Sequence, residues 1–510
     1  MKNTIKFMIG LLAIGLVSCE PEFENAVTDE GFYDAGDADF SNYVSLGNSL
    51  TAGYADSALY MSGQEDSYPN IMAEQFGFVG GGDFTQPLTS DNLGGLLYGG
   101  VQISGNRLVL SADENGNPFP TPLDGTPMTD VTTSATGPFN NMGVPGAKSY
   151  HLVTPGYGSV AGVANGTANP WFARFATSES TTVLADAVSL NPTFFSLWIG
   201  NNDILGYATS GGSGVDQAGN FDPSTYGGND ITDPNVFAAA YSAQVDALVA
   251  GGAKGVLLNI PDVTSIPYFT TVPAQSIPLD AATAGAVNAQ FAQYNDQILP
   301  LLVQFGVITQ EEADSRVVNF VEGINYPIIV DNELTNVSQV LQGPPGNLPE
   351  ELANLLGQLR QATSDDLIVL PASSVLGSVP DPSNPLGVVG VSIPLENQWV
   401  LTTTEQARVA AAGAAYNATI EGLAAANELG YGDMKSALAD VAANGAFYNG
   451  GVLTSTYVTG GAFSLDGVHP SPRGYAFTAN TIIDVINTTY NASIPKVDIG
   501  TYGTVTFHNN

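Results

Sequence analysis

The stretch VLADAVSLNPTFFSLWIGNND, residues 183–203, combines a helical pattern with an apolar run that ends in small polar residues. The stretch FAAAYSAQVDALVAGGAKGVLLNIPDV, residues 237–263, repeats this order with an amphipathic helix, a glycine-rich turn and a second apolar run. We expect buried strands over 193–199 and 255–260, because short apolar runs between turn signals are typical of strands covered on both faces. Alternation of such strands with helices predicts an α/β fold with a parallel sheet.

A third strand is expected at the start of YVSLGNSLTAGYADS, residues 43–57. Its apolar run breaks at Gly47, and a helical pattern begins near Leu50. Ser49 therefore lies where a strand passes into a helix, and ligands of parallel α/β sheets bind beyond the carboxyl ends of the strands. This position makes the Ser49 hydroxyl a candidate for chemistry.

The chain has only three histidines. We expect His508, in the tail, and His151, in GAKSYHLVTPG, to be structural or exposed. His469 differs because it follows Asp466 by three residues in a turn before a helix. Such a turn places a carboxylate beside the imidazole, orients it and stabilises its protonated form. The alternative is a loop in which Asp466 and His469 only cap the helix.

Four short motifs occur in a fixed order: GNSLTAG at 47–53, NNMGVPGAKS at 140–149, WIGNNDI at 198–204 and DGVHPS at 466–471. Together they resemble the four conserved blocks of the GDSL esterases and lipases, the SGNH hydrolase superfamily. The stretch NIPDVTSIPYF, 259–269, resembles a segment of the lipolytic members of that family. It favours the lipase and phospholipase branch over small acetylesterases.

The resemblance assigns roles to individual positions. Ser49 matches the nucleophile, His469 the base that activates it, and Asp466 the carboxylate that orients the base. Gly146 matches the block whose N–H faces the oxyanion, and Asn202 matches a side-chain donor to the same oxygen. The N–H of Ser49 would be the third donor of this oxyanion hole.

Each of these positions can also be interpreted as having only a structural role. Gly47, Gly53 and Gly146 can simply supply turns, and Asn202 and Asp203 can cap the helix that follows them. The four motifs in order, with a rare histidine at the expected place, favour the hydrolase.

The resemblance implies a three-layer α/β/α fold, flavodoxin-like in strand order, and hydrolysis of carboxylic esters through an acyl-serine intermediate. The expected substrates are lipid-like esters or acylated glycans, and the machinery needs no metal or cofactor. Asn48 departs from the family, because an aspartate usually occupies its position, and Asn201 lies at a variable position that can alter specificity. The alternatives are a carbohydrate acetylesterase and a lipid-anchored binding lipoprotein that kept the fold and lost turnover.

The N-terminal sequence reads MKNTIKFMIGLLAIGLVSC, with two lysines before an apolar run too short to span a membrane. This pattern predicts a secretory signal, and a buried N-terminal helix is the alternative. LVSC resembles the bacterial lipobox, and Cys19 is the only cysteine in the chain. We therefore expect a lipoprotein signal peptide over 1–18 and a lipid on Cys19 that holds the protein to a membrane.

The remaining chain divides by composition. We expect an acidic tether over 19–40, a hydrolase domain over 41–490 and a tail over 491–510. Insertions rich in Gly, Pro, Asn and acidic residues are expected at about 79–139 and 310–400, the first as loops or short strands. The second insertion reads as a segment that could cap a site.

The formal net charge of −37 makes nucleic acid a poor partner. It suits an exported protein whose copies repel one another. Glu20, Glu22 and Glu24, just after the cysteine, resemble surface-export signals of some Gram-negative lipoproteins. The sequence thus predicts an exported lipoprotein of the outer membrane, exposed to the periplasm or at the cell surface, and leaves its oligomeric state open.

Overall fold

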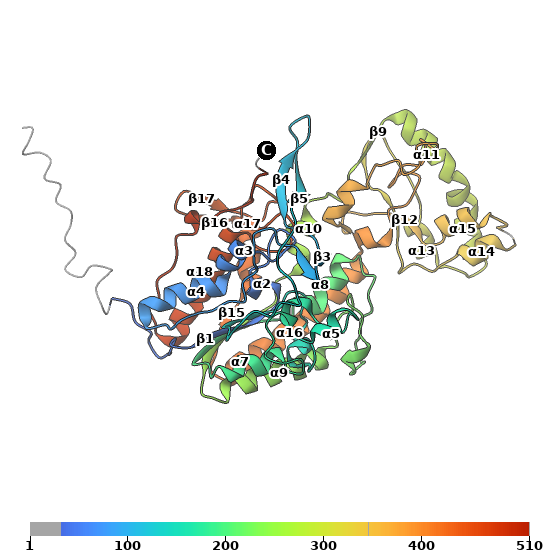
Figure 1. Cartoon of the computed structure of the whole chain (residues 1–510). Coiled ribbons are helices and arrows are strands. Elements are labelled where there is room, and N and C mark those ends of the chain that lie inside the picture. The colour runs from blue at the N-terminus through green and yellow to red at the C-terminus, as the bar shows by residue number, and fades with distance from the viewer. Residues whose placement is uncertain (1–31, 345, 509–510) are drawn as a thin grey trace, which may run out of the picture.

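The computed structural model describes residues 32–344 and 346–508. Its centre is a sheet of five parallel strands in the order β6–β1–β7–β8–β15 (Figure 1). The strands are β1 (Tyr43–Gly47), β6 (Asn141–Gly143), β7 (Phe194–Trp198), β8 (Lys254–Leu258) and β15 (Gly430–Gly432). The predicted α/β fold with a central parallel sheet is confirmed.

In chain order the strands are arranged 2-1-3-4-5, the order of doubly wound sheets of the flavodoxin type. In such a sheet the connections leave β1 in opposite directions along the sheet, which opens a crevice at the carboxyl ends of β1 and β7. Gly47, the last residue of β1, pairs with Gly143 on one side and with Trp198 on the other. The loops after β6 and β7 therefore flank the loop that carries Ser49.

The central strands are largely apolar because both of their faces are covered. Val44, Phe195 and Leu197 point into one buried cluster. Phe194 and Trp198 point into another on the opposite face. This double burial explains the continuous apolar runs of the sequence.

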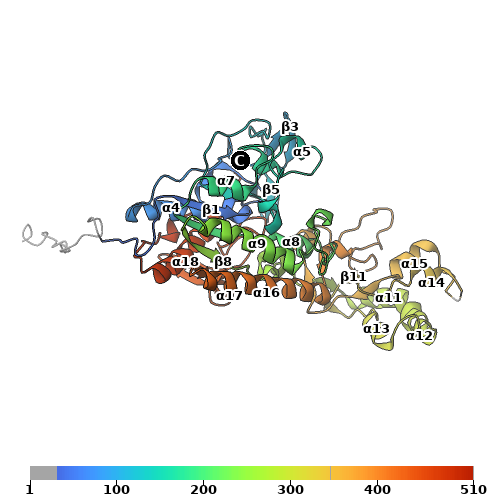
Figure 2. The ribbon, with the colours of Figure 1, turned by 90° about the horizontal axis from the view of Figure 1, so that it is seen from below.

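Helices cover the two faces of the sheet and complete three layers, which Figure 1 shows from the side, and Figure 2 looks onto one of the two helical layers from below. One face is covered by α7 (Val183–Ser189), α9 (Pro234–Val249) and α16 (Thr403–Ala426). The other is covered by α4 (Tyr68–Phe76) and α18 (Pro472–Tyr490), which pack against each other. Helix α18 begins immediately after the turn that contains Asp466 and His469.

A lobe with its own hydrophobic core extends from the sheet domain (Figure 1). Its buried apolar residues run from Ile277 to Val391, so the lobe begins well before residue 310, where we expected the insertion to start. The difference arises because Val287 and Phe291 of its first helix pack inside the lobe and not on the central sheet. Its main elements are β9 (Ile277–Leu279), α11 (Ala281–Gln293), α12 (Leu299–Gln304), α13 (Gln310–Ser315), β10 (Gly323–Asn325), β11 (Ile328–Val330), α14 (Ser338–Gln342), α15 (Glu350–Leu356) and β12 (Leu359–Gln361).

The expected insertion at 79–139 contains short strands joined by loops. Strands β2 (Leu96–Tyr98) and β3 (Val101–Ser104) form one antiparallel pair. Strands β4 (Leu108–Ala112) and β5 (Pro118–Pro122) form another. The C-terminal tail runs along this second hairpin, where the N–H of Leu110 donates to Thr506 at 2.8 Å.

The segment expected to be a tether is partly packed on the domain. The N–H of Asp37 donates to the carbonyl of Tyr490 at 2.7 Å, and Phe40 is buried against Phe76. The N–H of Asp34 also donates to Oγ of Ser493 at 2.8 Å, so the chain is bound to the domain from about residue 34 onward. The predicted signal peptide, Cys19 and the acidic residues after it lie outside the described residues and stay predictions. Across residues 32–344 and 346–508, no helix combines the length and apolar character needed to cross a bilayer.

Two glycines allow helix α2 (Ser49–Ala52), which carries Ser49, to pack directly on the sheet. A Cβ on Gly143 would lie 2.3 Å from the nitrogen of Ala52. A Cβ on Gly47 would lie 2.1 Å from Oγ1 of Thr51. Only glycine at these two strand ends leaves room for the helix.

We predict that Gly143→Ala pushes helix α2 away from β6 and lowers the free energy of unfolding by about 1–3 kcal/mol, the usual cost of overpacking. Urea unfolding measures this change. Gly422→Ala is the matched control, because Gly422 lies in helix α16 with open space around its Cα. We expect that control to be neutral or stabilising by up to about 1 kcal/mol. Equal stability of Gly143→Ala and the wild type would contradict the packing argument.

Candidate active site

Ser49 is the first residue of helix α2, two positions beyond strand β1. Asn48 caps this helix, since its Oδ1 accepts a hydrogen bond from the N–H of Leu50 at 2.9 Å. The N–H of Ser49, at the first helical position, has no acceptor within the helix. The sequence break at Gly47 thus leaves both a hydroxyl and a free backbone donor at the carboxyl end of the sheet.

Ser49, His469 and Asp466 form a continuous hydrogen-bonded chain. Nε2 of His469 lies 2.9 Å from Oγ of Ser49. Nδ1 of His469 lies 2.9 Å from Oδ2 of Asp466. The structure therefore brings together three residues that the sequence motifs singled out, two of them 420 positions apart.

The Asp466 carboxylate is held by several donors. Its Oδ1 accepts the N–H groups of His469 at 2.8 Å and Val468 at 2.9 Å, and the hydroxyl of Ser464 at 3.0 Å. Its Oδ2 accepts the N–H of Ser57 at 2.9 Å. Burial alone would raise the pKa of Asp466, but the His469 imidazole and the backbone donors outweigh burial and lower it to about 2. The carboxylate is thus kept charged beside the imidazole.

The donor at Ser57 depends on an unusual turn. Asp56 and Ser57 both have left-handed backbone conformations, with φ of 52° and 63°, which non-glycine residues adopt only at some cost. The turn is cross-linked to the histidine segment, because Oδ1 of Asp56 accepts the N–H of Leu465 at 3.0 Å. Sequence reasoning missed this turn, and the adjacent Asp and Ser, residue types that favour turns, were its only local signal.

The Tyr54 ring packs against the His469 ring, with centroids 4.7 Å apart. The Tyr54 hydroxyl donates to the carbonyl of Ser57 at 2.5 Å. Tyr54 therefore limits the rotation of the imidazole.

The expected oxyanion donors lie on the two loops that flank Ser49. Gly146 follows β6 in a left-handed conformation with φ of 80°, and among the described residues its N–H has no hydrogen-bond acceptor. Asn202 follows β7, and its Nδ2 donates to the carbonyl of Ala147 at 2.9 Å, which fixes the amide beside the Gly146 loop. The second hydrogen of that amide is available to a ligand, since Asn202 lines the same cavity as Ser49.

The structure explains how an asparagine is accommodated at position 48, where the family that the motifs resemble usually has an aspartate. Asn48 is fully buried, and its Nδ2 donates to Oδ1 of Asn201 at 3.0 Å. An aspartate at position 48 has no hydrogen to donate, so Asn201 would need to turn its own amide. The pair links the serine loop to the residue immediately before Asn202.

The other residues considered in the sequence have structural contacts. Asp203 is fully buried and accepts hydrogen bonds from the N–H and hydroxyl of Ser149 at 2.8 and 2.7 Å. His151 stacks on Tyr157, and burial lowers its pKa to about 4. His508 lies in the tail beside strand β4. None of these three side chains lines the cavity beside Ser49.

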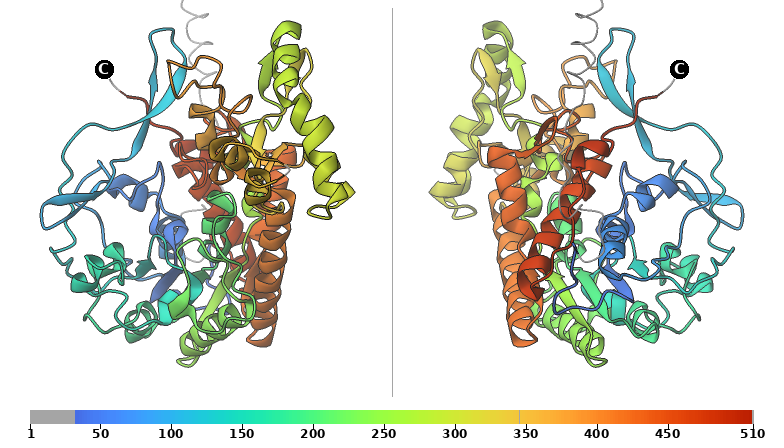
Figure 3. Two further views of the ribbon diagram at one scale, coloured as in Figure 1. Left: turned by 90° about the vertical axis from the view of Figure 1, so that its right-hand side faces the viewer. Right: turned by 90° about the vertical axis from the view of Figure 1, so that its left-hand side faces the viewer.

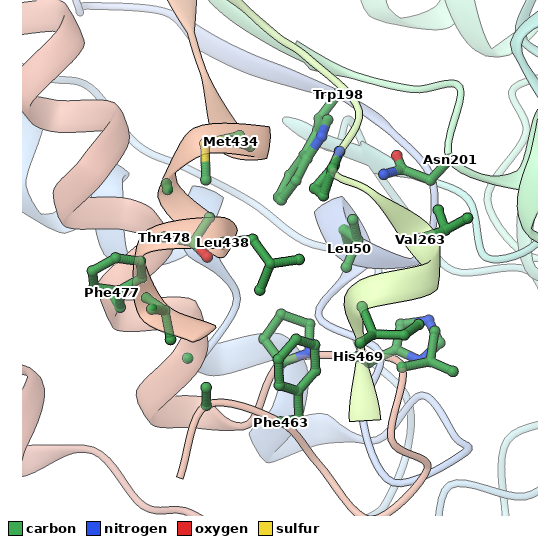
Figure 4. Close-up of a pocket in the computed structure, with 18 of the residues that line it drawn as sticks. Leu50, Trp198, Asn201, Val263, Met434, Leu438, Phe463, His469, Phe477 and Thr478 are labelled. Atoms are coloured by element: carbon green, nitrogen blue, oxygen red, sulfur yellow. The ribbon is translucent and has the colours of Figure 1, made fainter. Parts of the chain in front are cut away.

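An apolar cavity with a volume of about 110 Å³ opens beside Ser49 and His469 (Figure 4). Met434 and Leu438 of α17 (Met434–Asn444) lie across it from Leu50 and Val263. Phe463, Phe477 and Trp198 close other sides. Sequence reasoning missed the α17 wall, although its apolar residues at 434, 437, 438 and 441 follow helical spacing.

A wider groove, with a volume of about 1050 Å³, lies on another side of His469. It is lined by residues of the β4–β5 hairpin, by Tyr268 and Thr271, and by the segment 370–374 at the base of the lobe. The His469 imidazole lines both hollows, so it stands between them.

The structure offers no evident metal site near this imidazole. Within the described part of the chain, no group of three or more His, Cys, Asp or Glu side chains is placed to hold a metal ion. His469 has both ring nitrogens engaged by Ser49 and Asp466. The arrangement of Ser49, His469 and Asp466 can move a proton between the serine hydroxyl and a bound group.

We predict that Asp466 makes folding stability pH-dependent in acid. Its folded-state pKa of about 2 lies below the ordinary value of 3.8, so its contribution is present above about pH 4 and is lost as the pH falls toward 2. This contribution amounts to about 2 kcal/mol. Chemical unfolding of the wild type and Asp466→Asn should therefore differ most near neutral pH, and the difference should shrink toward about pH 2.5.

Asp484→Asn is the control for this comparison, because Asp484 forms an exposed ion pair with Lys496 at 3.1 Å. Exposed pairs contribute little to stability, so we expect almost no pH-dependent difference. An Asp466→Asn difference that stays constant across the acid range would contradict the lowered pKa.

Comparisons of the chain with family models, with curated proteins and with solved structures find no match. No relative therefore lends its activity or its site residues to this chain. The features that bear on function are the hydrogen-bonded Ser49, His469 and Asp466, the two flanking loops and the adjoining hollows.

Proposed function

We propose that this protein is a serine hydrolase of the GDSL type, with the SGNH hydrolase fold, that cleaves carboxylic esters through an acyl-serine intermediate. The observation that carries the proposal is the chain from Ser49 Oγ through His469 to Asp466, with both links at 2.9 Å, beside an apolar cavity. A serine hydroxyl becomes an effective nucleophile when a neighbouring base takes its proton. The geometry supports that role for His469.

In the proposed reaction, Nε2 of His469 accepts the proton as Ser49 Oγ attacks the ester carbonyl carbon. Asp466 keeps Nδ1 protonated and stabilises the positive imidazolium. His469 then donates the proton to the leaving alcohol, and later takes a proton from the water that releases the acid. The charged Asp466 carboxylate supports each step in which the imidazole carries a proton.

The negative charge on the carbonyl oxygen requires preorganised donors. The N–H groups of Ser49 and Gly146 and the amide of Asn202 are the proposed donors, and each follows the carboxyl end of one of three adjacent strands. One donor of this kind is typically worth about 3–4 kcal/mol of barrier. The Asn48–Asn201 hydrogen bond supports the placement of this set.

The apolar cavity supports an acyl group longer than acetyl. Its walls are almost entirely hydrocarbon, and burying each CH₂ group of a chain gains about 0.8 kcal/mol. An acetyl group has only one methyl carbon to place there. The cavity therefore favours an esterase or lipase over the alternative carbohydrate acetylesterase.

The proposed location remains that of an exported lipoprotein anchored through Cys19. The lipobox-like LVSC motif supports this, as does the acidic composition. The folded domain then works as a tethered catalyst at a membrane surface, where ester substrates with apolar acyl groups gather.

The decisive test is hydrolysis of p-nitrophenyl esters from acetate to palmitate by residues 20–510, which lack the lipidated cysteine. We predict turnover that Ser49→Ala lowers by about 10⁴-fold or more, because the nucleophile is lost. A fluorophosphonate probe should label the wild type at Ser49. Ser180→Ala, in an exposed loop, is the matched control and should keep full activity.

Failure of both turnover and labelling would overturn the hydrolase and favour the non-catalytic binding lipoprotein. A preference for acetate over all longer chains would favour the acetylesterase.

We predict that Leu438→Trp shortens the preferred acyl chain, because the larger side chain fills the cavity opposite Leu50. The kcat/KM for the octanoate ester should fall about tenfold, with the acetate ester little changed. Leu352→Trp, on the exposed side of α15 in the lobe, is the control. Equal losses on both esters would show that the acyl group does not enter this cavity.

A further inference from the structure

The groove beside His469 receives part of its lining from each of the two insertions of the chain. The β4–β5 hairpin contributes Phe119, and the base of the lobe contributes Ser373 and Ser374. Figure 3 shows the hairpin and the lobe standing at the same end of the molecule, on either side of the segments between them. The floor is the turn that holds Asp466 and His469.

The two hollows meet different parts of the catalytic chain. Ser49 and Asn202 line only the apolar cavity, and Asp466 lines only the groove. His469 lines both. With the carbonyl carbon at Ser49 and the acyl chain in the cavity, the leaving oxygen must lie near Nε2 of His469 to receive its proton. The groove is the second hollow that this imidazole lines, so it is the space we assign to the group attached to that oxygen.

Several aromatic rings face the groove in fixed positions. The hydroxyls of Tyr54, Tyr268 and Tyr457 each donate to a backbone carbonyl, at 2.5, 3.2 and 2.6 Å. The ring of Phe119 is 44% exposed on the hairpin. The three hydrogen-bonded tyrosine rings offer flat surfaces that need no reordering when a ligand binds.

Charged side chains are scarce in the groove. Among the described residues that line it, none is Lys or Arg, and its only carboxylate is Asp466. Serine and threonine hydroxyls, including those of Ser373, Ser374 and Thr271, supply uncharged polar atoms in addition to the tyrosine hydroxyls. An anionic group such as a phosphate would find no cation there and would lie near the negative Asp466.

We propose that this groove binds the alcohol portion of the ester, and that this alcohol is an uncharged, bulky polyol such as a sugar. This inference rests on the proposed ester hydrolysis. The groove volume is that of a site for a drug-sized ligand, far more than a methyl or ethyl alcohol occupies. Esters of phosphorylated alcohols, phospholipids included, are poor substrates on this argument.

The test compares three octanoyl esters that differ only in the alcohol: ethyl octanoate, octanoyl sucrose and octanoyl glycerol 3-phosphate. Release of octanoate is measured for each. We expect kcat/KM for the sucrose ester to exceed that for the ethyl ester by about tenfold or more, and the anionic ester to be the slowest.

Two variants of the groove separate its role from that of the catalytic chain. Phe119→Ala should lower kcat/KM for the sucrose ester by about fivefold and leave the ethyl ester unchanged. Ser374→Arg should raise kcat/KM for the anionic ester, because it supplies the missing cation. Ser180→Arg, on an exposed loop away from the groove, should change neither.

Each result decides between distinct conclusions. Activity on ethyl octanoate with no preference for sucrose and no effect of either variant would overturn the groove assignment while sustaining the hydrolase. If the effect of Phe119→Ala depended on acyl length and not on the alcohol, the acyl chain would lie in the groove. That result would also overturn the groove assignment. Activity on none of the three esters would overturn the proposed hydrolase itself.

Discussion

The hydrogen bond from the N–H of Ser57 to the Asp466 carboxylate joins two parts of the chain separated by 409 positions. It ties the turn after Ser49 directly to the carboxylate that orients His469. The reciprocal bond from the N–H of Leu465 to Asp56 and the bond from Tyr475 to the carbonyl of Tyr54 fasten the same pair of segments. The 2.9 Å distance between Ser49 and His469 follows from this cross-linking.

The strained turn at Asp56 and Ser57 fits this role. Left-handed backbone at two successive non-glycine residues costs free energy, and it persists where surrounding contacts determine it. Here it aims an N–H at Asp466 and places Asp56 against the histidine segment. Burial raises the pKa of Asp56, while hydrogen bonds from Leu465 and Tyr60 act in the opposite direction. Two carboxylates thus lie close together at one site, and hydrogen-bond donors stabilise the charge of Asp466.

The sequence predicted the parts of the fold whose signal is local. The strands at 194–198 and 254–258 could be predicted because short apolar runs between turn signals are typical of strands buried on both faces. The residues of the candidate site were found through short motifs, and the structure places Ser49, Asp466 and His469 in contact. The short motifs could not predict the location of elements that reach the site only through tertiary contacts.

The lobe boundary, the α17 wall and the groove were missed for that reason. Helix α11 has the same kind of apolar pattern whether it packs on the central sheet or within a separate lobe, so the sequence does not distinguish the two. Leu438 and Met434 have ordinary helical spacing, and only the fold shows that they face a cavity. The groove depends on the β4–β5 hairpin and on the segment 370–374 of the lobe, which are separated by more than 200 residues in the chain. No local pattern could bring these segments to one histidine.

The asparagine at position 48 illustrates how the site balances charge. A fully buried carboxylate there would require compensation, and within the described residues the side chain at this position has the N–H of Leu50 and the amide of Asn201 as its hydrogen-bond partners. The neutral amide satisfies both, since it accepts from Leu50 and donates to Asn201. It also leaves Asp466 as the carboxylate in direct contact with the imidazole, so the stabilisation of a protonated His469 depends on one buried charge. Exchange of an acid for an amide next to the serine is therefore compatible with the proposed chemistry, because the position shapes the loop and does not supply the proton.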